Sequence, residues 1–217
     1  MTDLVVVPAT AADVPELAGV LAQAFTGDPM SAALLGRPAT GPDAAARLRH
    51  LHAALLRSGP LRHGAVDVVR RAGGGPALGV AAWQAPGRGG SLRDEVREAR
   101  AFVRALGARR LPEALRQQAV LARHRPRHPH WYLLEVGVAD GARGLGVGSL
   151  LLGHRLAALD AEGQAAYLEA STPRSAALYA RLGFVRLGPV RGLPTPTPPT
   201  SMWRPAGVPP RGGASRG

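Results

Sequence analysis

The stretch Trp131–Ser149, WYLLEVGVADGARGLGVGS, decides the fold because it joins a strong strand signal to a glycine-rich turn. Trp131–Val138 is rich in aromatic and β-branched residues, which predicts a buried strand. Leu152, Leu156 and Leu159 then recur at helical spacing and predict an amphipathic helix. The order strand, glycine-rich turn, helix places the turn where a ligand can approach the backbone.

The turn indicates a cradle for a phosphate group. Closely spaced glycines let the main chain approach a ligand without Cβ clashes, and the free amides at a helix start favour an anion. A diphosphate of a dinucleotide, a nucleoside triphosphate or coenzyme A fits this pattern, and a glycine-rich turn without a ligand is the plainer alternative. The residues concerned are Arg143, Gly144, Leu145, Gly146, Val147, Gly148 and Ser149.

Two familiar phosphate-binding loops do not match. A Walker loop requires a lysine, and the chain contains none. A Rossmann fingerprint requires Gly-x-Gly-x-x-Gly near the front of a βαβ unit, whereas these glycines are spaced Gly-x-Gly-x-Gly and come late in the chain.

The composition of the 217 residues fits one globular domain, with 46% hydrophobic residues and no apolar run long enough to span a bilayer. No cysteine is present, which excludes disulfides, thiolate metal sites and a cysteine nucleophile. The acidic start of the chain is unlike a secretory signal, so we expect a cytoplasmic protein without membrane contact.

The formal net charge of +12 raises the question of nucleic-acid binding. All 27 basic residues are arginine and they are spread over many segments. Only three each of Tyr, Trp and Phe are available to stack on bases. A GC-rich codon bias explains the arginines better, although a basic nucleic-acid-binding protein stays an alternative.

The rest of the chain alternates between strands and helices and ends in a Gly/Pro/Arg tail. We expect a folded domain over residues 1–205 and a disordered tail over residues 206–217. Strands are predicted at Leu4–Val7, Ala65–Arg70, Leu78–Trp83, Ala165–Ala170 and Ser201–Arg204, and another is expected to start at Phe184-Val185. Helices are predicted from about Val14 to Phe25, after Pro42, over Ser91–Arg123, and between Thr172 and Gly183. The segment His124–Pro129, with its histidines, is expected to be a solvated loop and not a metal site.

Two motifs resemble the GCN5-related N-acetyltransferase (GNAT) family. Arg143-x-x-Gly146-x-Gly148 resembles its acetyl-CoA signature, and Leu178-Tyr179 followed by Gly183-Phe184 resembles its later landmark at the expected separation. Within the family, the chain looks closest to the puromycin N-acetyltransferase group, in the stretches HRPRHPHWYL, VGVADGARGLGVGS, YLEASTPR and SMWRP.

The resemblance implies a single α/β (α+β) domain. Its mixed, mostly antiparallel sheet would have six or seven strands, splayed at the centre and covered by helices on both faces. It also implies acetyl-CoA as co-substrate, no metal, and a homodimer in many relatives.

The resemblance further implies roles for individual residues. Tyr179 sits at the family position of the general acid that protonates the leaving thiolate. The backbone of Val136, Gly137 and Val138 would pair with the pantetheine arm and polarise the thioester carbonyl. Ser175 stands where many relatives carry an asparagine that binds the pantetheine.

The base and the amine pocket are less defined by the sequence. Glu135 and Glu169 are candidate bases or amine-binding carboxylates, and His130 ranks below them; structural pairing with arginine is the alternative. Strand alternation places Glu135 on the face opposite to Tyr132. Phe25, Asp28, Trp83 and Tyr132 are candidates for the substrate pocket.

We therefore expect an acetyl-CoA-dependent N-acetyltransferase acting on a primary amine of a small molecule, with antibiotic resistance or natural-product tailoring by analogy. A protein amino-terminal or lysine acetyltransferase is an alternative within the family. A catalytically silent acyl-CoA sensor is an alternative outside enzymology.

Overall fold

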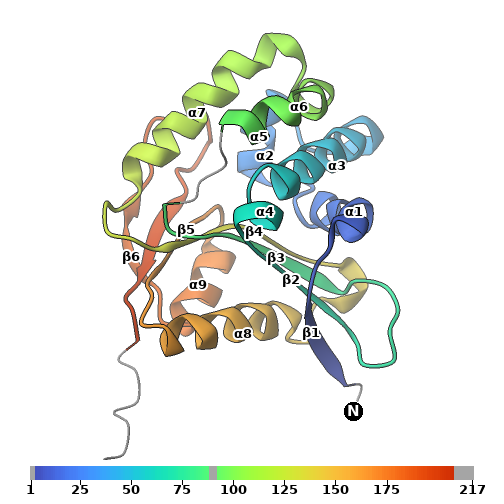
Figure 1. Cartoon of the computed structure of the whole chain (residues 1–217). Coiled ribbons are helices and arrows are strands. Elements are labelled where there is room, and N and C mark those ends of the chain that lie inside the picture. The colour runs from blue at the N-terminus through green and yellow to red at the C-terminus, as the bar shows by residue number, and fades with distance from the viewer. Residues whose placement is uncertain (1–2, 88–91, 208–217) are drawn as a thin grey trace, which may run out of the picture.

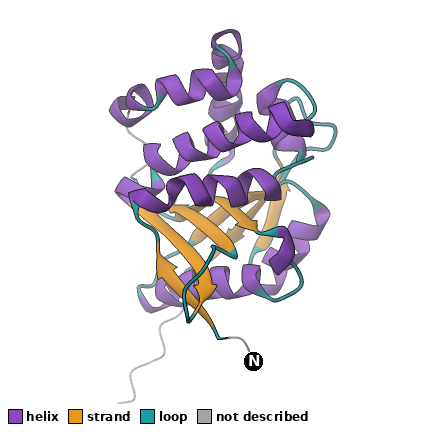
Figure 2. Ribbon diagram, turned by 90° about the vertical axis from the view of Figure 1, so that its right-hand side faces the viewer, coloured by secondary structure: helices purple, strands orange, loops and turns teal. Residues whose placement is uncertain are grey.

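The computed structural model describes residues 3–87 and 92–207. Within them, seven strands form one open sheet in the order β1-β2-β3-β4-β5-β7-β6. Every neighbouring pair is antiparallel except β4 and β5, which are parallel. The predicted mixed, mostly antiparallel sheet with helices on both faces is confirmed (Figures 1 and 2).

The strands lie close to their predicted positions. They are β1 (Leu4–Pro8), β2 (Gly64–Arg71), β3 (Gly79–Gln84), β4 (Trp131–Val138), β5 (Ala166–Ala170), β6 (Val185–Pro189) and β7 (Thr200–Arg204). Trp131–Val138 has the predicted bounds, because its apolar and β-branched residues lie in the middle of the sheet, buried on both sides.

The helices divide between the two faces of the sheet (Figure 1). One face carries α1 (Val14–Ala24), α2 (Pro29–Leu35), α3 (Gly41–Ser58), α4 (Pro60–His63), α5 (Leu92–Arg97), α6 (Ala99–Leu106) and α7 (Leu111–His124). The other face carries α8 (Val147–Ala161) and α9 (Pro173–Arg181). Short 3-10 turns at Ala11–Asp13, Ala108–Arg110 and Asp140–Ala142 precede α1, α7 and α8.

The sheet separates two apolar cores. On the α8 face, Leu151, Leu152 and Leu156 pack with Trp83 and Leu133. On the opposite face, a second cluster joins α1 to β2 and β3 through Leu17, Leu21, Val66, Val68 and Val80. This alternation along the strands is what fixes which side chains reach which face.

One helix differs from the sequence prediction. The sequence predicts a helix from about Val14 to Phe25 and none directly after it, whereas α2 follows at once, with Asp28 as its N-cap. The Asp28 side chain accepts hydrogen bonds from the backbone amides of Met30 and Ser31, 2.9 and 3.0 Å away, and Pro29 occupies the first helical position. Asp28 is thereby held at a fixed place above the sheet.

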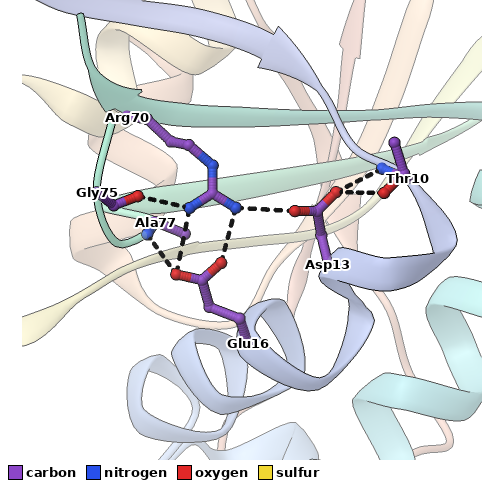
Figure 3. Close-up of polar contacts among 6 residues, drawn as sticks. All are labelled: Thr10, Asp13, Glu16, Arg70, Gly75 and Ala77. Atoms are coloured by element: carbon purple, nitrogen blue, oxygen red, sulfur yellow. Dashed lines mark hydrogen bonds and ion pairs between the residues drawn. The ribbon is translucent and has the colours of Figure 1, made fainter. Parts of the chain in front are cut away.

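An ion-pair network ties α1 to the β2–β3 hairpin (Figure 3). The Arg70 guanidinium donates to Glu16 and to Asp13, at 2.7 and 2.9 Å, and to the Gly75 carbonyl oxygen at 2.8 Å. The backbone amide of Ala77 donates to Glu16. The hydrogen bond from Arg70 keeps the pKa of Glu16 below its ordinary value of 4.5.

A second ion pair joins the sheet to the helix that follows the glycine-rich turn. Arg155 of α8 donates two hydrogen bonds to the buried carboxylate of Asp67 in β2, at 2.9 and 2.6 Å. This bidentate pair fixes the position of α8 beneath the sheet.

Two sequence-based predictions fall partly outside the described residues. Ser91, the predicted start of the third helical region, lies there, and α5 is described from Leu92. The predicted disordered tail lies outside from residue 208 onward.

Candidate active site

The glycine-rich turn has the conformation that only its glycines adopt readily. Gly144 and Gly146 have φ angles of +82° and +77°, and Gly146 is the residue that caps the start of α8. Val147, the first helical residue, is 1% exposed and anchors the turn in the core. A Cβ built on Gly146 meets no protein atom within 4 Å, so this stretch of main chain is open on its outer side.

The amides behind this turn have no acceptor within the helix, as the predicted cradle requires. Those of Val147, Gly148 and Ser149 lie in the first turn of α8, where a helix supplies no carbonyl acceptor. Arg143 lies at the rim, with its side chain half exposed and paired with Asp140 at 2.8 Å. The arrangement offers backbone donors and the positive end of a 15-residue helix to an anion.

The sheet opens next to the cradle. β4 pairs with β5 only at its start, through Trp131 with Ala166 and Tyr132 with Tyr167. On the other side, β4 stays paired with β3 as far as Val138. The edge of β4 that faces β5 is therefore free of sheet pairing from Leu133 to Val138 among the described strands. An extended ligand can add to such an edge through main-chain hydrogen bonds.

A β-bulge in β4 corrects one sequence-based prediction. Ala82 lies opposite Glu135 and the next residue, Trp83, lies opposite Leu133, so Leu134 is extra. Strict alternation breaks there, and Glu135 comes to the same face of the sheet as Tyr132, the face covered by α1, α3 and α7. The prediction that the two point to opposite faces was wrong, because alternation was counted through a residue that the pairing skips.

Tyr179 lies beneath the opening between β4 and β5. It is 7% exposed and packs edge-on against Phe184 at 6.0 Å between ring centroids. Burial raises the pKa of the Tyr179 phenol, and the negative charge of Asp28 raises it further. Asp28 belongs to the other face of the sheet (Figure 1), so its charge acts on Tyr179 from across the sheet.

Ser175 is already engaged within the protein. Its hydroxyl donates to the Thr172 carbonyl oxygen at 2.9 Å, and its backbone amide donates to the Thr172 hydroxyl at 3.1 Å, which together cap α9. Contact between Ser175 and a pantetheine arm stays a prediction, and it requires this hydroxyl to reorient or to accept a second hydrogen bond.

Glu169 lies in a buried polar cluster. The Tyr132 hydroxyl donates to Glu169 at 2.8 Å, and the Arg125 guanidinium lies over the Tyr132 ring, 3.7 Å from its centroid. Burial raises the pKa of Glu169, while the charge of Arg125 opposes the shift. The plainer alternative for Glu169, a carboxylate compensated by arginine, is therefore supported by its neighbours.

Glu135 has a partner that sequence reasoning missed. The imidazole of His52, from α3, lies with Nδ1 2.7 Å from Glu135 Oε1, and both side chains are at most 5% exposed. The ring of Phe25 lies 5.0 Å from the His52 ring. His52 gives no motif in the sequence, since it is one of several histidines and lies 83 residues from Glu135.

Two other candidates lie apart from this group. Trp83 is fully buried in the core on the α8 face, away from Phe25 and Asp28. His130 precedes β4, where it contacts Tyr167 and Trp203, at the end of the strand opposite to the glycine-rich turn.

A cavity of about 570 Å³ lies beside Asp28. It is lined by Gly27 and Pro29 on either side of that residue, by Arg110, and by Pro194 and Pro196 from the loop between β6 and β7. Within the described residues, no helix is long and apolar enough to cross a membrane, and no cluster of three or more metal-ligating side chains is found.

Known proteins match both the sequence and the fold. The model of the Acetyltransferase (GNAT) family matches residues 97–184. A Corynebacterium glutamicum structure, described as histone acetyltransferase HPA2 and related acetyltransferase, is 36% identical, with a TM-score of 0.71 over 95% of this chain and 97% of that one.

A more distant structural match shows the same fold. Arylalkylamine N-acetyltransferase 2 from Aedes aegypti is 16% identical, with a TM-score of 0.60 over 94% of this chain and 99% of that one.

Proposed function

The chain belongs to the GNAT family of acetyltransferases, and from this premise we propose that it transfers acetyl from acetyl-CoA to the primary amine of a small molecule. Direct attack within a complex of both substrates is the proposed route. The observation that carries the proposal is the juxtaposition of the open glycine cradle, the unpaired edge of β4 and the buried phenol of Tyr179.

Acetyl-CoA fits the first two of these features. We propose that the amides of Val147, Gly148 and Ser149 bind its diphosphate, with Arg143 adding charge at the rim. The pantetheine arm would then pair with the free edge of β4, and a backbone amide among Val136–Val138 would polarise the thioester carbonyl.

Tyr179 suits the final proton transfer. Its raised pKa keeps the phenol protonated at neutral pH, so it holds the proton that the leaving thiolate needs. The charge of Asp28 opposes formation of a tyrosinate. A cationic amine bound near Asp28 would neutralise that charge and make the phenol a better donor.

The acceptor side, our name for the face of the sheet proposed to bind the amine, is the face covered by α1, α3 and α7 (Figure 1). It is acidic around the β4–β5 opening. Asp28, Glu135 and Glu169 come from the elements around it, and Phe25 and Tyr132 supply aromatic surface. This combination favours an amine with an organic body. Antibiotic resistance and natural-product tailoring remain proposals that rest on the resemblance to the puromycin group.

The test is thiol release from acetyl-CoA across a panel of amines, including puromycin, agmatine, 2-phenylethylamine and spermidine. Turnover of one or more of these with stoichiometric acetyl transfer supports the proposal. Absence of thiol release with every small amine would reject it.

A second candidate is acetylation of protein lysine, because the Corynebacterium glutamicum relative is described as a histone acetyltransferase and related acetyltransferase. A lysine-containing peptide in the same panel separates the two. Higher kcat/KM for the peptide than for every small amine favours the second candidate.

A further inference from the structure

The His52–Glu135 pair is a buried polar group without an evident structural use. Its two members lie on different elements, α3 and β4, with His52 Nδ1 2.7 Å from Glu135 Oε1. The other two polar atoms, His52 Nε2 and Glu135 Oε2, are buried and have no hydrogen-bond partner within residues 3–87 and 92–207. Buried acceptors without partners carry a free-energy cost of about 1–3 kcal/mol each, and a ligand that donates hydrogen bonds to them would remove that cost.

The pair faces the acceptor side of the opening. Glu135 precedes Val136, so it begins the stretch of β4 proposed to hold the thioester, and the bulge turns its side chain toward α3. Phe25 covers the His52 ring and lies three residues before Asp28, whose charge reaches Tyr179. His52 therefore lies between the proposed amine pocket and the strand that would carry the thioester.

In this arrangement the carboxylate of Glu135 would orient the imidazole of His52. When the Nδ1 hydrogen points to Glu135, the tautomer is fixed and a lone pair on Nε2 can accept a proton. An imidazolium formed at Nε2 is then stabilised by the carboxylate at 2.7 Å. The other charged groups assigned to this side of the opening are Asp28, which caps α2, and Glu169 with Arg125 around Tyr132.

We propose that His52 is a catalytic residue that accepts the proton of the substrate ammonium at Nε2, with Glu135 as its positioning residue. This inference rests on the proposed function. R–NH3⁺ gives one proton to His52 and becomes the free amine, whose lone pair forms the C–N bond to the thioester carbon. The tetrahedral adduct collapses by breaking the C–S bond, Tyr179 protonates the leaving thiolate, and the second nitrogen proton returns the phenol to its neutral form.

Isosteric variants of His52 separate this role from a purely structural one. His52→Asn keeps a donor near the Nδ1 position for Glu135 but removes the acceptor at Nε2. His52→Gln places an amide near Nε2 and removes the Nδ1 donor. Neither side chain can take up a proton, so both variants lose the proposed function. His50→Asn, on the exposed side of the same helix, is the matched control.

The readout is the dependence of the loss on amine basicity. The substrates are 2-phenylethylamine, which is protonated at pH 8, and its 2,2-difluoro analogue, which has almost the same shape and is largely neutral there. We expect both His52 variants to lose about 100-fold or more in kcat with 2-phenylethylamine and only a few-fold with the analogue. His50→Asn should match the wild type with both amines.

The outcomes test the role of His52 separately from the proposed function on which it rests. Wild-type thiol release across the amine panel tests the proposed function, while the ratio of the losses in kcat with the two phenylethylamines tests His52. Equal losses with both amines, or wild-type kcat in His52→Asn, would overturn the catalytic role. Wild-type kcat in His52→Asn would mean that His52 only positions Glu135. Unchanged acetyl-CoA affinity in the variants confirms that the fold and the cradle are intact.

Discussion

Gly146 has two separate roles in this account: its backbone has a positive φ, and its open side leaves room for a ligand. Replacing Gly146 by alanine tests the two roles separately. Gly146 has φ +77°, a region that costs an L-amino acid roughly 1–2 kcal/mol. The new methyl group meets no protein atom within 4 Å, so no steric cost within the protein is added. Gly163, which follows the other end of α8, has φ +63° and the same free space, and is therefore the matched control.

Both variants should lose the same amount of stability. A cost of roughly 1–2 kcal/mol lowers Tm by about 2–8 °C for a chain of this size, measured by thermal scanning without ligand. Acetyl-CoA at about 100 times its Kd should then add about 2.7 kcal/mol to the wild type and to Gly163→Ala. Gly146→Ala should gain much less at the same concentration, because its methyl group occupies the open side of the cradle.

An equal ligand-induced rise in Tm for both variants would refute the placement of the diphosphate at Gly146. Gly146→Glu sharpens the test, since it adds a carboxylate where an anion is expected to bind. Full retention of acetyl-CoA binding in that variant would contradict both the steric and the electrostatic parts of the argument. The two ends of a 15-residue helix lie about 22 Å apart, so the control reports on the helix without touching the ligand.

Three further predictions address catalysis and stability. Tyr179→Phe should lower kcat by about 100-fold or more with little change in acetyl-CoA affinity, and an unchanged kcat would reject the role as acid and favour an acyl-CoA sensor. Asp67→Ala should lower the free energy of unfolding in urea by about 3 kcal/mol, because it leaves Arg155 unpaired in a largely buried position. Arg70→Met should destabilise the protein at neutral pH. Because the pKa of Glu16 is lowered in the folded state, the stabilisation is present above its ordinary value of 4.5, and the difference from wild type should shrink as pH falls below that value. A difference that stays constant down to pH 3 would contradict this account.

The sequence alone predicted the parts of the fold that depend on local patterns. Trp131–Val138 has the predicted bounds because an uninterrupted apolar, β-branched run is a strong local signal. The turn after it was predicted because only glycine adopts positive φ without cost, and Gly144 and Gly146 both do so. The start of α9 followed from Thr172, whose side chain caps the helix.

The parts that failed depend on contacts between distant segments. The bulge at Leu134 is a property of the pairing of β4 with β3, so single-strand alternation placed Glu135 on the wrong face. His52 was missed because its importance comes from Glu135, 83 residues away. Trp83 was considered a pocket residue from its type alone, and the sheet register turns it into the core on the α8 face.

The distribution of charge matches the opposite charges of the two proposed substrates. The chain has a formal net charge of +12, which favours the approach of a polyanion such as coenzyme A to the arginine-rich surface and the cradle. The acceptor side of the sheet instead gathers Asp28, Glu135 and Glu169, with Arg125 near Glu169 and Arg110 in the cavity beside Asp28. In the proposed function, a cationic amine would be attracted to the opening from one face while the anionic cofactor would bind at the end of α8. Because Asp28 also raises the pKa of Tyr179, we expect arrival of the amine to be coupled to proton donation. Asp28→Asn should weaken binding of cationic amines more than of neutral ones, which a comparison of KM for the two amines would measure.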